Sequence, residues 1–309
     1  MSVLRAIFAQ GFFSSGPVLA AVLIGGVVAL VSAPAGLLTV MRSHSFAGHA
    51  FSEVTATGGS AAYVVGVGPL VGYVVAALAG AGAMGALGVE RHKNRDLVAG
   101  IVLGATLGLT ALFLYLTTTS QSTTGAAVTV LFGSLFAVSS SDWPTVLALG
   151  GVALILVLVG WRPLLLSSVS PELAAARGVR LRLLESAYLA AVALAVALAS
   201  MTVGAILSTA LLIGPAASAL RFARSPGRAC AWAALIGLVA VWGGIVLAYD
   251  SYDWPPTQQG WPVSFFVVFL VLTAYLAAQL LSRGRGDRRR RLEGARVAPR
   301  DALDARDEA

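Results

Sequence analysis

Cysteine and histidine are scarce in this sequence, and their scarcity excludes two common ways of building a site. The 309 residues include one cysteine, Cys230, and three histidines. A single cysteine excludes an internal disulfide and a thiolate cluster, and three histidines leave few ways to build a metal site from imidazole alone. The phosphate-binding pattern GxxxxGK(S/T) is also missing from the sequence. The chain therefore lacks the usual loop for hydrolysing ATP.

Charged residues are few as well, at 11% of the chain, whereas 58% of the residues are hydrophobic. Long apolar runs recur along almost the whole length, which is typical of a membrane-spanning protein. A net charge of +7 is also found in nucleic-acid-binding proteins. Here, however, the basic residues lie in short loops between apolar runs and in the C-terminal tail, as the positive-inside rule describes. We therefore expect the lipid bilayer as a partner and no nucleic acid.

The apolar runs predict an all-α, polytopic helical bundle with about nine transmembrane helices. The predicted spans are residues 17–40, 45–67, 70–89, 96–116, 145–160, 184–202, 205–220, 229–248 and 263–281. Residues 125–138 are too short for a normal span and are interpreted as a re-entrant segment, which protein or water must shield. With nine spans, every basic loop and the tail fall on one side, and the N-terminus lies outside. Residues 1–282 then form one transmembrane domain, and residues 283–309 are expected to be a disordered cytoplasmic tail of mixed charge.

A polar segment at membrane depth, residues 46–60 (FAGHAFSEVTATGGS), gives the strongest functional signal. It contains His49 and Glu53, the two ionisable residues that the pattern places inside the bilayer. As residues i and i+4 of a helix, they leave the same face. A carboxyl group near mid-bilayer costs on the order of 3 kcal/mol unless it is paired, hydrated or protonated. We interpret the pair as a functional site, and a neutral, hydrogen-bonded packing pair is the structural alternative.

An imidazole nitrogen and a carboxylate oxygen form a ligand set that suits Zn, Mn or Fe(II) rather than Cu(I). Two protein ligands, completed by water or hydroxyl groups, bind a cation weakly, and weak binding suits a transit site because release must be as easy as entry. We therefore predict that His49 and Glu53 are ligands of a transported divalent cation and that no cofactor is bound permanently. The hydroxyl groups expected along the pathway, on or beside the same helix face, are those of Ser45, Ser52 and Thr57.

A short, capped helix is predicted in a cytoplasmic loop, over residues 171–177. Ser170 is a good N-cap, Pro171 suits the first helical position, and Glu172 suits the positive end of the helix dipole. Gly178 fits the left-handed position that follows a helix. So short a helix is stable only if something packs on it. From the residues alone, packing on the membrane or the bundle and docking of a cytoplasmic partner explain it equally well.

One further acid near the start of a predicted span, Glu185, is interpreted as a partner of its own helix dipole.

Five segments, in the same order, resemble the permease subunit of bacterial ATP-binding-cassette (ABC) importers for zinc, manganese or iron(II). They are residues 41–50 (MRSHSFAGHA), 131–134 (LFGS), 170–174 (SPELA), 211–217 (LLIGPAA) and 221–226 (RFARSP). Each motif is weak alone, but five in order are specific, and the similarity extends over residues 17–281. The family usually has an aspartate four residues before the buried histidine, where this chain has Ser45. Glu53, one turn after His49, is the candidate replacement.

The resemblance implies a transport subunit of the bacterial cytoplasmic membrane and not an enzyme. It also implies a permease homodimer, a cytoplasmic ATPase subunit and an extracytoplasmic protein that delivers the metal ion, with translocation by alternating access. The short helix then resembles the coupling helix that inserts into the ATPase. The residues that this resemblance assigns to the coupling helix are Pro171, Glu172, Leu173, Ala174, Arg177 and Gly178.

Other functions fit parts of the sequence. The chief alternative is an ATP-independent secondary transporter that uses His49 and Glu53 as a proton or cation relay and needs no coupling helix. An importer of a different solute would leave the same two residues purely structural. An intramembrane metalloenzyme is disfavoured, because the sequence has no HExxH or other paired-ligand motif and no recognisable activated nucleophile.

Overall fold

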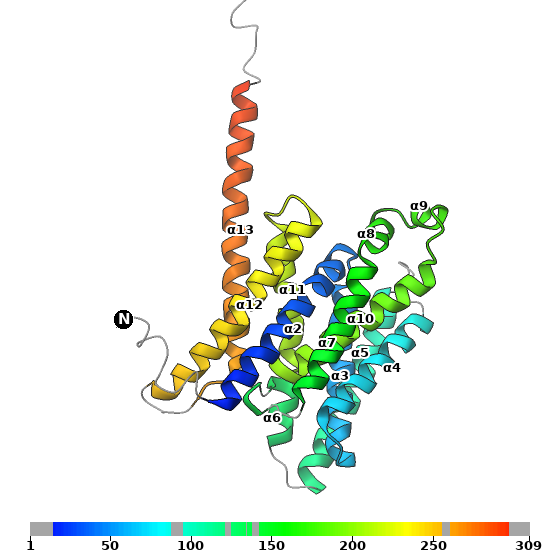
Figure 1. Ribbon diagram of the computed structural model, residues 1–309, viewed down its shortest axis with the longest axis vertical. Coiled ribbons are helices and arrows are strands. Elements are labelled where there is room, and N and C mark those ends of the chain that lie inside the picture. Colours follow the sequence, from blue (N-terminus) through cyan, green and yellow to red (C-terminus); the bar gives the residue numbers. More distant parts are fainter. Residues whose placement is uncertain are drawn as a thin grey trace, which may run out of the picture.

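The described part of the chain is helical throughout. The computed structural model describes residues 15–87, 95–120, 125–133, 135–137, 142–254 and 260–296. Every regular element in these ranges is an α-helix or a short 3-10 helix, which confirms the predicted all-α class. Figure 1 shows the helices slanted side by side in a bundle, with α13 at one side and extending beyond it.

The helices are bounded mainly by glycine, proline and polar residues, as expected where a helix must stop or start. α3, for example, ends at Gly66, which has φ of 78°. In chain order the elements are α2 (Gly16–Met41), α3 (Ser45–Val65), α4 (Pro69–Leu87), α5 (Arg95–Ser120), α6 (Gly125–Phe132), η2 (Leu135–Ala137), α7 (Trp143–Val159), α8 (Trp161–Val169), α9 (Pro171–Ala176), α10 (Leu181–Val203), α11 (Ala205–Leu220), α12 (Pro226–Asp250), η3 (Ser251–Asp253) and α13 (Val263–Arg296).

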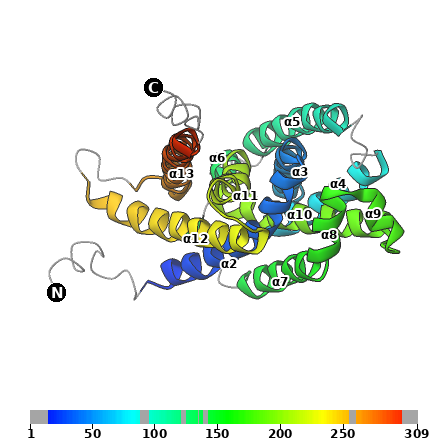
Figure 2. The same ribbon diagram turned by 90° about the horizontal axis from the view of Figure 1, so that it is seen from above.

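The predicted count of nine spans is not confirmed. Within the described residues, six helices are long and apolar enough to cross a membrane, and α7 with α8 makes a seventh across a bend of 55°. α11 falls short because it has 16 residues, and α3 because polar side chains lower its hydropathy. Both lie within the bundle when it is viewed from above (Figure 2). α3 packs against α4, α5, α10 and α11, so that neighbouring helices shelter its polar groups.

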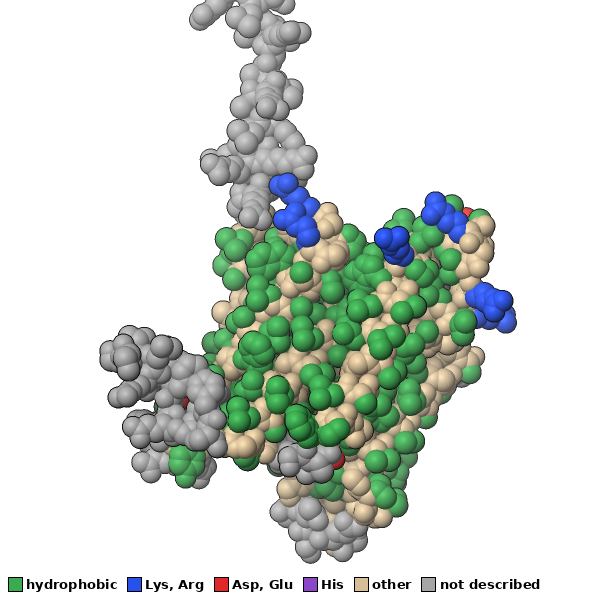
Figure 3. Space-filling model, viewed as in Figure 1, with side chains coloured by type: hydrophobic (Ala, Val, Ile, Leu, Met, Phe, Trp, Pro, Cys, Tyr) green, Lys and Arg blue, Asp and Glu red, His purple; other side chains and the backbone are tan. Residues whose placement is uncertain are grey.

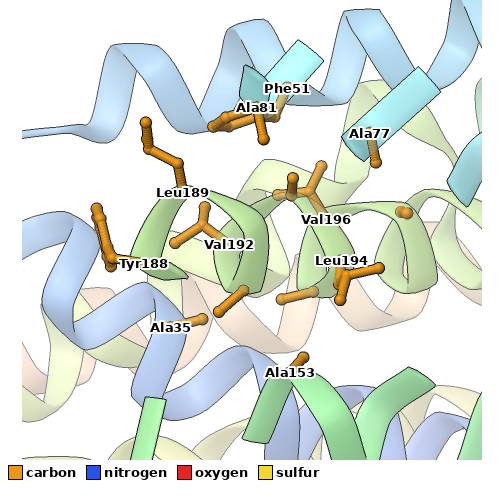
Figure 4. Close-up of a cluster of buried hydrophobic side chains, with 14 of the residues drawn as sticks. Ala35, Phe51, Ala77, Ala81, Ala153, Tyr188, Leu189, Val192, Leu194 and Val196 are labelled. Carbon is orange, nitrogen blue, oxygen red and sulfur yellow. The ribbon is translucent and has the colours of Figure 1, made fainter. Parts of the chain in front are cut away.

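α10 forms the centre of the packing. Almost every residue from Tyr188 to Val203 is buried, as expected for a helix that is apolar all round. Its many alanines let neighbouring helices approach closely. Figure 4 shows side chains of α10 meeting side chains from four surrounding helices, namely α2, α3, α4 and α7. The α10 residues labelled there are Tyr188, Leu189, Val192, Leu194 and Val196, and the facing residues are Ala35, Phe51, Ala77, Ala81 and Ala153.

The two ends of the bundle differ in charge. On the face shown in Figure 3, the blue Lys and Arg side chains gather along the upper edge, where Figure 1 places α8, α9 and the loop before α12. α13 also leaves the bundle at this edge, and α2 begins at the opposite one. By the positive-inside rule the basic edge is cytoplasmic. α9 and the C-terminal end of α13 therefore lie on the same side, as the sequence predicted.

Two helices extend further than the sequence indicated. α5 continues through the threonines at 117–119, beyond the predicted end of the span at residue 116, and each of their hydroxyls donates to a carbonyl one turn earlier in the helix. In α13 the apolar span Val263–Ser282 agrees with the predicted span 263–281, and the helix itself continues to Arg296. The disorder expected from residue 283 is thus replaced by helix as far as residue 296, and residues 297–309 lie outside the described residues. The domain boundary at residue 282 stays a prediction.

α6 does not cross the bilayer. Its eight residues extend for about 12 Å, less than half of a hydrocarbon core of about 30 Å. It ends at Gly133, with φ of 75°, directly against Gly204, with φ of 94°, at the junction of α10 and α11. A Cβ atom on Gly133 would lie 2.4 Å from the Gly204 nitrogen, and one on Gly204 would lie 2.4 Å from the Leu131 carbonyl oxygen. Glycine is therefore required on both sides of this contact.

Gly133→Ala is expected to lower the thermal stability of the detergent-solubilised protein. The left-handed backbone alone costs about 1–2 kcal/mol for an alanine, and the clash with Gly204 adds to that cost. Gly104→Ala is the matched control, because Gly104 lies in α5 with nothing within 4 Å of an added Cβ. Unfolding followed by intrinsic fluorescence should give a lower Tm for G133A than for G104A. Equal Tm values would contradict the close contact.

Candidate functional site

α3 is the helix that carries His49 and Glu53, and it begins at a tight turn. The turn comprises Arg42, Ser43 and His44, and Ser43 has φ of 56°, an uncommon value for a residue with a Cβ atom. The amide of His44 donates to the Thr39 carbonyl oxygen over 2.8 Å. The turn therefore holds the start of α3 against the C-terminal end of α2.

His49 and Glu53 lie one helical turn apart on α3. His49 is half-buried, and Glu53 is 6% exposed. Counted at about 1.5 Å per residue from Ser45, the imidazole is about 6 Å and the carboxyl group about 12 Å along the helix from its cytoplasmic end. Both predicted ligands thus lie within the bundle, in the first half of α3.

A hydroxyl group of α11 contacts the imidazole. His49 Nδ1 lies 3.3 Å from Thr209 Oγ1, and the direction of this hydrogen bond depends on the histidine tautomer. One residue earlier on α11, the hydroxyl of Ser208 donates to Ser52 Oγ over 2.8 Å. These two contacts join the predicted site face of α3 to α11.

Two further hydroxyl residues of α3, Thr55 and Thr57, contact other helices. The hydroxyl of Thr55 donates to Ser200 Oγ of α10 over 2.9 Å. Thr57 Oγ1 lies 2.9 Å from Thr110 Oγ1 of α5, and its hydroxyl also donates to the Thr106 carbonyl oxygen over 3.0 Å. The hydroxyls of Ser52, Thr55 and Thr57 therefore bond to α11, α10 and α5, which satisfies these hydroxyls inside an apolar bundle.

The predicted pathway hydroxyls do not share one environment. Ser45 is half-buried at the first position of α3, whereas Ser52 is fully buried against α11. Thr57 is half-buried against α5. Ser52 and Thr57 each contact a hydroxyl of a different helix, so the structure brings both to the packing seams around α3. Their role in a pathway stays a prediction.

Thr209 is the contact residue that sequence reasoning missed. It lies in an apolar run, and a threonine in a membrane helix commonly bonds only to a carbonyl of its own helix, as Thr118 does. The sole signal in the sequence is the pair of hydroxyl residues, Ser208 and Thr209, within the otherwise apolar start of α11. The positions of Ser208 and Thr209 in the sequence do not determine which neighbouring helix their side chains face.

Three or more carboxylate, imidazole or thiol side chains do not come together as a metal-binding group anywhere in the described ranges. Any cation site on α3 therefore rests on the imidazole of His49 and the carboxyl group of Glu53, supplemented by neutral oxygen atoms. Such a site is suited to transient binding rather than to a structural metal, which usually has four protein ligands when the metal is zinc.

The short cytoplasmic helix forms as predicted. In α9 the Ser170 side chain accepts a hydrogen bond from the Leu173 amide over 3.2 Å, and Pro171 occupies the first turn. Gly178 has φ of 79°, and the amides of Gly178 and Val179 donate back into the end of the helix. Both ends of α9 are thus capped by the residues that the sequence indicated.

α9 buries one side chain, and its other side chains are exposed to solvent. Ala174 is fully buried, and α9 contacts α8 and α10. Pro171, Glu172 and Arg177 are exposed, and Leu173 is 47% exposed. α9 is therefore held to the bundle by one side and exposed on the rest of its surface.

The fold and these sites define a class, a polytopic helical membrane protein with a polar helix inside its bundle and a short helix exposed on its cytoplasmic edge. The chain belongs to the ABC 3 transport family, whose family model matches residues 16–278. The family resemblance and the location in the cytoplasmic membrane, both predicted from the sequence, are thereby confirmed.

Two relatives of this chain are named as membrane proteins of zinc and manganese transport systems. The chain is 32% identical over 241 residues to the membrane protein ZnuB of a high-affinity zinc uptake system in Haemophilus influenzae, covering 76% of this chain and 90% of the relative. It is 30% identical over 234 residues to MntC, a manganese transport system membrane protein of Halalkalibacterium halodurans, covering 75% of this chain and 77% of the relative.

A solved structure shares the fold. PsaBC from Streptococcus pneumoniae, solved in complex with Fab, matches with a TM-score of 0.72 at 22% identity. The match covers 88% of this chain and 94% of the matched chain.

Proposed function

We propose that this chain is the permease subunit of an ABC importer for a divalent metal ion, such as zinc, manganese or iron(II). The observation that carries the proposal is the His49–Glu53 face on α3, enclosed in the bundle of an ABC 3 family member. The zinc and manganese systems named for its relatives support the same class of cargo. The chain itself is a transport subunit and not an enzyme.

In this proposal the cation is bound transiently between the imidazole of His49 and the carboxylate of Glu53. Water and the neutral oxygen atoms beside them complete the coordination. Nitrogen and oxygen ligands suit all three candidate ions, so these two residues set the class of the cargo rather than its identity. Few protein ligands keep affinity low enough for release.

Thr209 is proposed to orient the imidazole. When Nδ1–H donates to the Thr209 hydroxyl, the lone pair of Nε2 is available to the cation. A hydrogen bond on the nitrogen away from the metal commonly fixes a ligand histidine in this way. Thr209 is thus a positioning residue on α11, opposite the two ligands on α3.

Energy is proposed to enter through α9. The chain lacks the ATP-binding loop, so a separate cytoplasmic ATPase subunit hydrolyses ATP and contacts the exposed residues of the helix. Alternating access is driven by this ATPase, in a homodimer of permeases that receives the ion from an extracytoplasmic binding protein. These partners follow from the family to which the chain belongs.

His49→Ala and Glu53→Gln should each reduce metal uptake by about ten-fold or more, since losing about 1.4 kcal/mol of binding costs a factor of ten. Uptake of radioactive zinc or manganese by cells that express the complete transporter measures the loss. Asp142→Asn is the matched control, because Asp142 is a carboxylate away from α3. If both α3 variants are present in the membrane and transport at the wild-type rate, the assignment of the site is wrong.

Thr209→Val should raise the KM for metal uptake by about ten-fold with a smaller change in kcat, as expected for loss of a group that orients a ligand. Thr209→Ser keeps the hydroxyl and should keep the KM close to that of the wild type. Uptake measured over a range of metal concentrations separates the two parameters. Equal KM values for T209V and T209S would exclude the orienting role.

Leu173→Glu should abolish copurification of the ATPase, because a charge then replaces the exposed leucine of the contact surface. Thr119→Glu introduces the same charge at the outer end of α5 and should leave copurification unchanged. Affinity purification of a tagged permease followed by an assay for the bound ATPase measures the effect. Full uptake by L173E, or by cells that lack the ATPase, would favour a secondary transporter instead.

A further inference from the structure

One arginine at the cytoplasmic end of the bundle joins three elements that are distant in the sequence. Arg42 belongs to the turn before α3, and its guanidinium forms an ion pair with the carboxylate of Glu185 on α10. It also donates to Ser167 Oγ over 3.1 Å and to the Leu164 carbonyl oxygen over 3.4 Å, both on α8. These contacts make Glu185 a partner of Arg42 across the fold, which corrects the earlier interpretation of Glu185 as a partner of its own helix dipole.

An aromatic ring completes the contacts of the arginine. The guanidinium carbon lies 4.9 Å from the centre of the Tyr188 ring on α10, within the range of a cation–π interaction. The Tyr188 hydroxyl in turn lies 3.2 Å from Thr39 Oγ1 on α2. The side chains of Arg42 and Glu185 are 8% and 12% exposed. A planar, five-donor guanidinium suits such a many-sided contact, and an ammonium group does not.

The position of this cluster gives it a role beyond packing. α8 and α10 are the two elements that α9 contacts and between which it lies in the chain. Arg42 is followed by α3, where His49 comes one turn after Ser45. Arg42 therefore connects α8 and α10, the two elements that α9 contacts, with the turn that precedes α3, in addition to the direct packing of α10 against α3.

A cavity next to the cluster separates the same elements. It has a volume of about 500 Å³ and is lined by residues of the α2–α3 turn, α8, α9 and the start of α10. Ser43, Ser168, Pro171 and Arg182 are among them. Open space thus lies between α9 and the start of α3, and the side chains of Arg42 and Glu185 border it.

We infer that Arg42, held by Glu185 and Tyr188, is the positioning residue that makes the α8–α10 segment and the start of α3 move as one body. Displacement of α9 by the ATPase is thereby delivered to His49 and Glu53, which opens or closes the cation site. This inference rests on the proposed function, because it needs an ATPase that acts on α9.

The chemical test compares metal uptake with ATP hydrolysis in the complete transporter reconstituted in vesicles. Glu185→Gln and Arg42→Lys should each lower the number of ions imported per ATP by at least about five-fold, the lower end of typical coupling between sites. ATPase binding and ATP hydrolysis should remain, because α9 keeps its exposed face. Asp142→Asn changes a carboxylate outside this cluster, at the start of α7, and is the matched control, with a wild-type ratio.

The outcomes distinguish failure of the proposed function from failure of the Arg42 inference. If the wild-type complex imports no metal, the proposed function fails. If the wild type imports metal and the folded E185Q and R42K complexes keep the same ratio of ions to ATP, the Arg42 inference is wrong. Simultaneous exchange of the charges, Arg42→Glu with Glu185→Arg, should recover part of the ratio if the pairing itself matters.

A distance measurement tests the same inference without altering the ion pair. Spin labels on S43C and A175C, in a Cys230→Ala background, report the separation of the α2–α3 turn from α9. This separation should stay within about 2 Å between nucleotide-free and ATP-bound complexes, the scale of a small helix shift. Labels on A175C and T119C should change their separation by more than that. A larger change in the first pair, or no change in the second, overturns the inference even if the charge variants fail to fold.

Discussion

The need to satisfy polar groups inside the bilayer is the constraint on which the rest of the structure depends. α3 carries an imidazole, a carboxyl group and a series of hydroxyls, and on hydropathy it does not qualify as a span. Surrounding helices must therefore supply hydrogen-bond partners that lipid cannot. α11 contacts His49 and Ser52, α10 contacts Thr55, and α5 contacts Thr57. The arrangement of the bundle around α3 follows from this requirement.

The same requirement explains why α10 is almost entirely apolar. A helix that is buried on every side has no water for polar side chains, and small side chains let its neighbours pack closely. α10 ends at Gly204, where the backbone turns into α11 and meets the end of α6. The centre of the bundle is thus rigidly packed apolar material. The polar contacts of α3 lie around it.

Local chemistry in the sequence predicted some of these features. The caps of α9 could be predicted because Ser170, Pro171 and Gly178 act within a few residues of one another. The face shared by His49 and Glu53 follows from helical spacing, and the five ordered motifs indicated the family. The length of α5 was underestimated, because its threonines bond within the helix although their composition resembles a loop.

Contacts between distant segments could not be predicted in the same way. The pairing of Arg42 with Glu185 joins residues that are far apart in the chain, and no local pattern distinguishes it from a helix-dipole interaction. Thr209 is similarly indistinguishable from any hydroxyl residue in an apolar run until the fold places it beside His49. The predicted count of nine spans is not confirmed, because α11 is short and polar side chains lower the hydropathy of α3.

The central claim is that a divalent cation passes between His49 and Glu53. It is tested most directly by a structure of the complete transporter determined with manganese, in which anomalous scattering locates the ion. The account predicts an anomalous peak at coordination distance from the imidazole and the carboxylate, with Nε2 of His49 as the nearest nitrogen. A peak elsewhere in the bundle, with no contact to either residue, would contradict it.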